Sequence, residues 1–169
     1  NIISTSDSTD IARGKYLVYG PAHCATCHVP MNEIHRIDKG EELPLKGGWE
    51  YEFALGTFRA PNLTPHVTGI KNIPDSVLAR SIRYSVNHNN KVMFPFMPFQ
   101  DMADSDIRAV LSFLRSQKAI ENKVAPTELS FIGKALVTIG MLAPKFPNNM
   151  PSKSVQPDST IEFGKYIAH

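Results

Sequence analysis

The chain has 169 residues, a length that suits one domain with an extension better than two full domains. Eighteen basic and 16 acidic residues leave a formal net charge of +2, which argues against nucleic-acid binding driven by bulk charge. Apolar residues make up 42% of the chain, enough for a core, and no run approaches the roughly 18 apolar residues of a transmembrane segment.

The first half of the chain predicts a helix followed by a long loop. Apolar residues favour one side of a segment from Thr9 to about Gly20, which predicts a helix. Residues 29–74 are interrupted throughout by glycine and proline, which predicts a loop. So long a loop is unusual in a compact domain, and it becomes reasonable if it surrounds a large rigid ligand.

The second half predicts further helices. Apolar residues recur every four positions from Leu78 to Val86, which predicts a helix that continues to about Val86, with Asp75 as its N-terminal cap. Residues 105–117 carry the clearest helical pattern. The apolar segment 129–142 predicts one more helix, either packed on its own domain or serving as a docking surface. No strand is predicted, so the expected fold class is all-α.

One short pattern occurs twice. "IARGKYLV" at 11–18 returns as "IEFGKYIA" at 161–168, with four identities in eight residues. Either the likeness is chance, or a second domain begins at about residue 160. We expect the second.

The stretch "CATCH" at 24–28 carries the strongest chemical signal, because Cys-x-x-Cys-His is the spacing of covalent haem attachment. Cys24 and Cys27 would form thioethers with the two vinyl groups, and His28 would bind the iron. A redox dithiol and half of a zinc site, completed by His23 and His35, are the alternatives.

The second axial position of such an iron decides its function. A methionine ligand indicates an electron carrier, whereas an open position indicates gas binding or peroxidase activity. We predict Met97, because prolines stiffen its loop "PFMPF" and phenylalanines can shield the iron. Met93 is the second choice, and a histidine ligand (His66 or His88) remains an alternative.

Taken in order, these motifs resemble a class I c-type cytochrome over about residues 10–120. "GKYLV" resembles the family's N-terminal helix, and "DSDIRAVLSFLRS" resembles its C-terminal helix, so the resemblance implies that Phe113 packs against Gly14. "APNLT" resembles the loop in which a proline carbonyl accepts the axial histidine's Nδ1–H, which makes Pro61 the expected partner of His28.

A narrower resemblance covers "LKGGWEYEFALGTFRAPNLTPHVTGI" at 45–70, which is similar to haem domains of multihaem cytochrome subunits. Those subunits serve membrane-bound dehydrogenases of alcohols, aldehydes and sugars. One departure is His66, where the family usually has an acidic residue. The resemblance implies a monohaem domain at 1–122 and an extension or linker at 123–169.

Four further residues are candidates for contact with the haem propionates: Trp49, Tyr51, Arg59 and Asn62. Arg59 could form a charge-assisted fork with a carboxylate, or be a surface arginine. Trp49 could donate a hydrogen bond or simply pack. Asn62 could donate to a propionate or hold a turn.

The expected function is one-electron transfer by haem c with His28 and Met97 as axial ligands, without an enzymatic activity of its own. The expected partners are a dehydrogenase, an oxidase or another cytochrome of a respiratory chain. The resemblance implies a periplasmic or otherwise extracytoplasmic location. Two alternatives are an open-iron haem protein and a docking module in which 123–169 holds a larger assembly.

Overall fold

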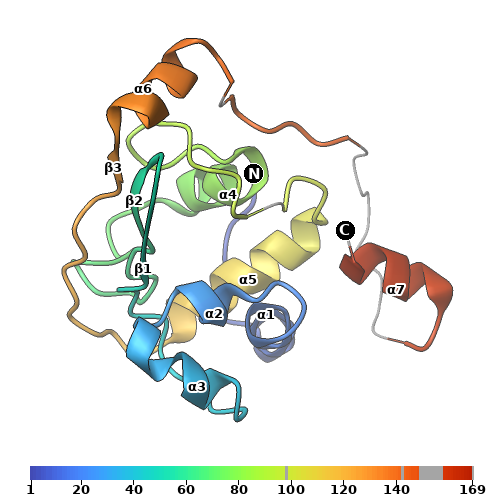
Figure 1. Cartoon of the computed structure of the whole chain (residues 1–169). Coiled ribbons are helices and arrows are strands. Elements are labelled where there is room, and N and C mark those ends of the chain that lie inside the picture. Colours follow the sequence, from blue (N-terminus) through green and yellow to red (C-terminus); the bar gives the residue numbers. More distant parts are fainter. Residues whose placement is uncertain (98, 142, 149–157, 169) are drawn as a thin grey trace. The chain divides into compact units, whose positions relative to one another are not determined.

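The computed structural model describes residues 1–97, 99–141, 143–148 and 158–168, and Figure 1 labels its helices and strands. In chain order these are α1 (Ser8–Tyr19), α2 (Cys24–Cys27), the 3-10 helix η1 (Met31–Glu33), α3 (Ile34–Ile37), β1 (Glu50–Phe53), β2 (Gly56–Arg59), α4 (Asp75–Tyr84), α5 (Asp104–Ser116), β3 (Glu128–Leu129), α6 (Phe131–Thr138) and α7 (Ile161–Ala168).

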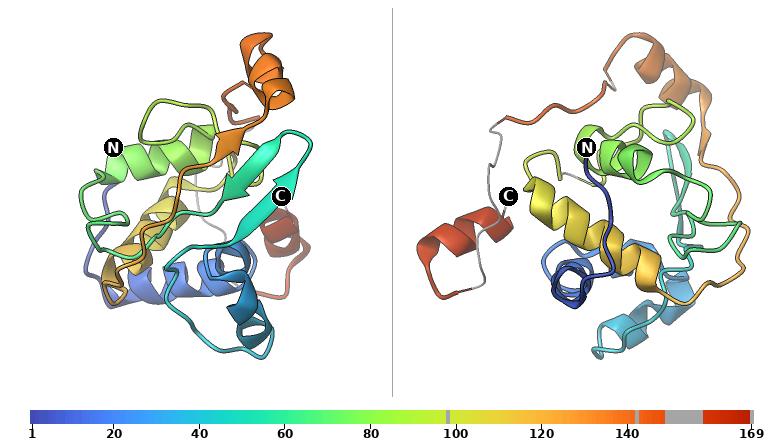
Figure 2. Two further views of the ribbon diagram at one scale, coloured as in Figure 1. Left: turned by 60° about the vertical axis from the view of Figure 1, so that its left-hand side comes forward. Right: turned by 180° about the vertical axis from the view of Figure 1, so that it is seen from behind.

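The expected all-α fold class is wrong, because the segment 29–74 and the segment after α5 together form a small sheet. Its three strands are antiparallel in the order β1-β2-β3, visible in Figure 2, so the fold is mixed α/β with a minor share of sheet. Tyr51 and Phe53 alternate with glutamates along β1, which is the period of a strand. Glycine and proline on both sides of this short pattern concealed it.

The described residues fall into two compact units. Unit 1 contains residues 1–17, 73–113 and 144–169, and unit 2 contains residues 18–72 and 114–143. These two units do not coincide with the predicted domains, which meet at residue 122. The predicted domain at 1–122 is a haem-binding module, and its boundary stays a prediction.

In unit 1, α1 lies directly on α5 at a glycine. A Cβ atom at Gly14 would lie 1.9 Å from the Ala109 carbonyl oxygen and 2.9 Å from Phe113 Cβ, so no larger residue fits without a shift. The predicted approach of Phe113 to Gly14 is therefore present. Beside it, Arg13 donates from Nε and Nη2 to the two carboxylate oxygens of Asp106, at 3.0 and 2.9 Å.

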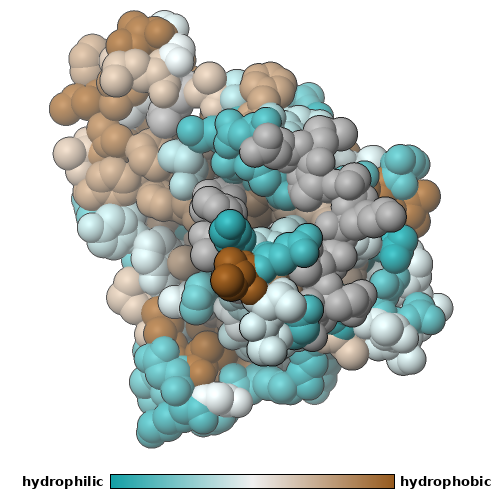
Figure 3. Space-filling view, turned by 90° about the vertical axis from the view of Figure 1, so that its right-hand side faces the viewer, coloured by the Kyte–Doolittle hydropathy of each residue, from teal (hydrophilic) through white to brown (hydrophobic). Residues whose placement is uncertain are grey.

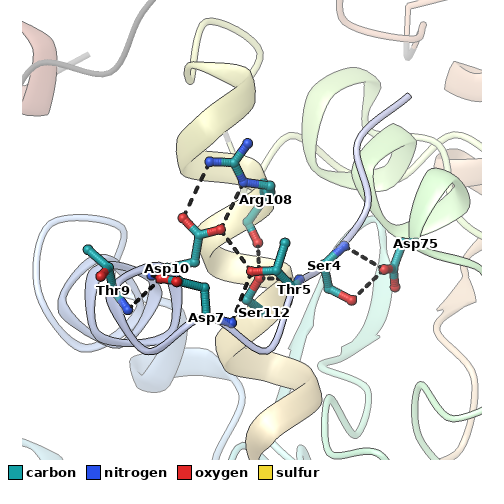
Figure 4. A network of polar contacts seen from close by, with 8 residues as sticks. All are labelled: Ser4, Thr5, Asp7, Thr9, Asp10, Asp75, Arg108 and Ser112. Carbon is teal, nitrogen blue, oxygen red and sulfur yellow. Dashed lines mark hydrogen bonds and ion pairs between the residues drawn. The ribbon is translucent and has the colours of Figure 1, made fainter.

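Polar contacts hold the segment before α1 against two helices of unit 1 (Figure 4). Ser4 donates its N–H and its hydroxyl to Asp75 at the start of α4, at 2.8 and 2.6 Å. Thr5 N–H donates to Ser112 of α5 at 2.9 Å. The N-terminal residues thus connect α4 with α5 and leave the Asp75 carboxylate engaged with Ser4.

In unit 2, α6 is an apolar helix anchored at its first turn. Ser130 caps it by accepting from Gly133 N–H at 3.2 Å, and a Cβ at Gly133 would lie 2.2 Å from the Leu55 carbonyl oxygen. Phe131 is nonetheless 88% exposed, and brown side chains gather at the top of Figure 3. The predicted helix within 129–142 is confirmed, but it is shorter and largely exposed.

None of the helices in the described ranges has both the length and the apolar character required to cross a membrane.

Candidate functional site

The CATCH stretch forms one helical turn followed by a buried histidine. Cys24 and Cys27 begin and end α2, and the His28 N–H donates to the Cys24 carbonyl at 2.9 Å. Both cysteines are free thiols and half-buried, whereas His28 is 7% exposed. The helical turn therefore holds two thiols and an imidazole within five consecutive residues.

The imidazole of His28 is oriented by the loop at residues 60–64. Its Nδ1 lies 2.9 Å from the Pro61 carbonyl oxygen. Because a carbonyl oxygen only accepts, Nδ1 carries the proton and Nε2 keeps its lone pair. Burial lowers the pKa of His28, and the bond to Pro61 only partly offsets this. The neutral ring is therefore suited to bind a metal ion through Nε2.

The two thiols are held in the neutral form. Burial raises the pKa of Cys24 to about 12, and burial also raises the pKa of Cys27. A redox dithiol requires a thiolate near neutral pH, so these environments do not favour that alternative. Within the described ranges, no three His, Cys, Asp or Glu side chains form a group that could hold a metal ion, which leaves the zinc alternative without its usual four ligands.

Asn62 is a buried connector of the loop that presents Pro61. It is 2% exposed, and its Nδ2 donates to the Ile120 carbonyl at 2.8 Å while its Oδ1 accepts from Thr64 N–H at 2.9 Å. The Thr64 hydroxyl also donates to Ile120 at 3.1 Å. The amide of Asn62 thus joins the loop to the segment after α5, and its predicted role at a propionate stays a prediction.

Arg59 and Trp49 lie at the β-hairpin. Arg59 pairs with Glu50 through Nε and donates from Nη1 to the Pro126 carbonyl at 2.8 Å. Trp49 stacks on Tyr51 with ring centroids 5.6 Å apart. The contacts of Arg59 tie β2 to β1 and to the segment before β3. The roles predicted for Arg59 and Trp49 at a haem stay predictions.

Met97 belongs to unit 1, whereas the other predicted site residues belong to unit 2. It is half-buried in the loop between α4 and α5, as is Met93, whose N–H donates to the Ser85 carbonyl at 2.7 Å. The neighbouring Pro98 lies outside the described residues. The pairing of His28 with Met97 stays a prediction.

Of the other histidines, His66 is bound within its own loop, where its Nδ1 lies 2.9 Å from the Thr68 hydroxyl. This contact gives the ring a local structural role.

Sequence reasoning missed Gly47 as a residue of this site. It is buried, it has φ +71°, and its backbone contacts both His28 and Pro61. The available signal was the pair Gly47-Gly48, because paired glycines mark positions where the backbone takes a positive φ or approaches another chain segment closely.

Comparison with known proteins gives two weak similarities to components of dehydrogenases. The chain is 28% identical over 124 residues to the fructose dehydrogenase cytochrome subunit of Gluconobacter japonicus, covering 70% of this chain and 24% of that relative. It is 24% identical over 125 residues to a subunit of nicotinate dehydrogenase from Pseudomonas putida, covering 72% of this chain and 10% of that relative. No protein-family model matches the chain.

The chain therefore spans about a quarter and a tenth of the lengths of these curated relatives. The first relative's name agrees with the cytochrome resemblance carried by residues 10–120, so the similarity supports a cytochrome-like domain.

Proposed function

We propose that this chain is an electron-transfer module that carries one covalent haem c, with Cys24 and Cys27 as attachment residues and His28 and Met97 as axial ligands. The observation that carries the proposal is the buried, neutral His28 with its Nδ1–H on the Pro61 carbonyl. A bound haem would supply reversible one-electron chemistry at its iron.

The residues of unit 2 fit this group in their chemistry. Pro61 fixes the plane and tautomer of the His28 ring and increases the basicity of Nε2. Asn62 keeps the Pro61 carbonyl in place through its contact with Ile120. Met97 would add a soft, neutral thioether, which raises the reduction potential relative to a second histidine and closes the iron to outside ligands.

The proposed role is that of an electron carrier or an electron-transfer subunit, not of an enzyme by itself. Its partners would be redox proteins: a dehydrogenase, an oxidase or another cytochrome. The dehydrogenase is favoured by the names of the two relatives. We place the module in the periplasm or another extracytoplasmic compartment, where c-type haem is attached in the family that it resembles.

The first test is to produce the chain in cells that attach haem c and to record optical spectra of the oxidised and reduced forms. We expect a c-type spectrum that stays with the polypeptide after denaturation. Replacing both Cys24 and Cys27 with alanine should release the haem on denaturation. A wild-type protein without haem would overturn the proposal.

The axial methionine is tested by the matched pair Met97→Ala and Met93→Ala, which change two half-buried methionines of the same loop. We expect only Met97→Ala to abolish the methionine–iron charge-transfer band at the red edge of the spectrum and to let carbon monoxide bind the reduced form. The opposite result would move the ligand to Met93. Ready carbon monoxide binding by the wild type would support gas binding or peroxidase activity instead.

A further inference from the structure

Gly47 contacts both partners of the bond that orients the His28 ring. Its N–H donates to the His28 carbonyl at 2.8 Å. The position of its missing Cβ lies 2.5 Å from the Pro61 carbonyl carbon and 2.6 Å from the Pro61 carbonyl oxygen. Since His28 Nδ1 lies 2.9 Å from that same oxygen, the three residues form a closed ring of contacts within unit 2.

Backbone hydrogen bonds on both sides fix Gly47 opposite Pro61. Ala60 N–H donates to the Trp49 carbonyl at 3.0 Å, and Gly48 N–H donates to the Ala60 carbonyl at 3.0 Å. Beyond Pro61, Leu63 N–H donates to the Leu45 carbonyl at 2.8 Å. These bonds extend the β1–β2 pairing, so the segment that contains Gly47 cannot move away from Pro61 without breaking them.

A side chain supports the same pairing. Gln117 accepts from Leu45 N–H at 2.9 Å through Oε1, and its Nε2 lies 3.4 Å from the Leu63 carbonyl, to which it donates. It therefore bridges the two segments next to the contact between Gly47 and Pro61.

We propose that Gly47 is a positioning residue that sets the distance and angle of the bond between His28 Nδ1 and the Pro61 carbonyl, and thereby tunes the reduction potential of the iron. This inference rests on the proposed function. Any Cβ at residue 47 would collide with backbone atoms of Pro61 and displace its carbonyl from His28. A weaker bond to Nδ1 makes Nε2 a poorer donor, which favours ferrous over ferric iron.

The test compares Gly47→Ala with Gly48→Ala in the haem-loaded protein. Both glycines have positive φ, +71° and +99°, so both variants strain the backbone. Among the described residues, the atom nearest to a Cβ at Gly48 would lie 3.5 Å away, so only Gly47→Ala adds the collision. Relative to Gly48→Ala, we expect Gly47→Ala to lower the equilibrium ratio of ferric to ferrous iron about threefold. At about 59 mV per tenfold for one electron, this is an increase of about 30 mV in the reduction potential.

A second pair of variants, both at Gln117, tests the same inference if Gly47→Ala does not fold. Gln117→Ala removes the bridge without adding an atom, and Gln117→Glu keeps an acceptor for Leu45 N–H. We expect Gln117→Ala to shift the potential upward and to speed hydrogen exchange of the His28 Nδ1 proton, measured by NMR on the reduced protein. Gln117→Glu should restore part of both values.

Two results overturn the inference while leaving the proposed function standing. One is a haem-loaded Gly47→Ala protein with the potential of Gly48→Ala; the other is Gln117→Ala with wild-type potential and wild-type exchange. A wild type without covalent haem overturns the proposed function itself, so the two failures are distinct.

Discussion

Helices α1 and α7 of unit 1 both contain the sequence Gly-Lys-Tyr, but a different residue of this sequence contacts α5 in each helix. In α1, Gly14 lies on the Ala109 carbonyl of α5, and Tyr16 is 44% exposed. In α7, no atom of the described residues lies within 4 Å of the missing Cβ of Gly164. In α7 the tyrosine contacts α5 instead, because the Tyr166 hydroxyl donates to the Asp106 carboxylate at 2.6 Å.

The difference shows that a local pattern determines a helix but not the face that the helix buries. Both copies are helical because both carry good helix formers around one glycine. Which residue touches α5 depends on how the helix approaches it. Replacing the glycine should therefore destabilise α1 but not α7, and replacing the tyrosine should destabilise α7 but not α1.

Gly14→Ala should have the largest effect. The added methyl group meets the Ala109 carbonyl at 1.9 Å, so α1 must move away from α5. We expect the free energy of unfolding to fall by about 3 kcal/mol, the upper part of the usual range for overpacking. Chemical denaturation followed by circular dichroism measures it, and a loss below about 1 kcal/mol would contradict the close packing.

Tyr166→Phe should have the second largest effect, because it removes two hydrogen bonds. The hydroxyl donates to Asp106 and accepts from Ala103 N–H at 3.1 Å. We expect the docking of α7 to weaken by about 2 kcal/mol, as for bonds to charged groups. Faster hydrogen exchange in residues 161–168 would report it, and Tyr16→Phe is the matched control.

The pH dependence of this contact provides a further check. Burial, together with the bond to Asp106, raises the pKa of Tyr166. The folded state therefore keeps a proton that the unfolded state releases above about pH 10, so the stability that Tyr166 contributes is present below that pH and is lost above it. We expect the difference between wild type and Tyr166→Phe to narrow as the pH rises past 10, and a constant difference would contradict the burial.

Gly164→Ala should be mildly stabilising. The site is exposed and open, so alanine gains helix propensity without a collision. We expect α7 to gain about 1 kcal/mol or less. Slower exchange of its amides would show the gain, whereas destabilisation would mean that the face of Gly164 is covered in solution.

Tyr16→Phe should have the smallest effect. The ring stays in place under the Arg13 guanidinium, which lies 5.5 Å from its centroid, and only a hydroxyl is lost from a tyrosine that is 44% exposed. We expect a change within about 0.5 kcal/mol. A larger loss in thermal unfolding would place the hydroxyl of Tyr16 in a contact comparable to that of Tyr166.

At the candidate site, sequence reasoning named residues that lie in a strong local pattern and did not name residues whose position depends on the pairing of distant segments. The contact between His28 and Pro61 is present where the resemblance places it. The β-hairpin was missed because its strands have only four residues each, bounded by glycine and proline that also indicate loops. Gln117 lies in no motif, and the pair Gly47-Gly48 indicates only an unusual backbone position. The importance of Gly47 and Gln117 follows from the segments that they face.

The sequence by itself determined the helices α1, α4 and α5 and the order of the chemical motifs, because helical periodicity and Cys-x-x-Cys-His are local patterns. The tertiary structure alone decided the sheet, the burial and protonation of His28, the contacts of Gly47 with His28 and Pro61, and the different roles of the two Gly-Lys-Tyr segments. The physical reason is that these features depend on backbone segments far apart in the chain. Their hydrogen bonds and close contacts form only when the fold brings them together.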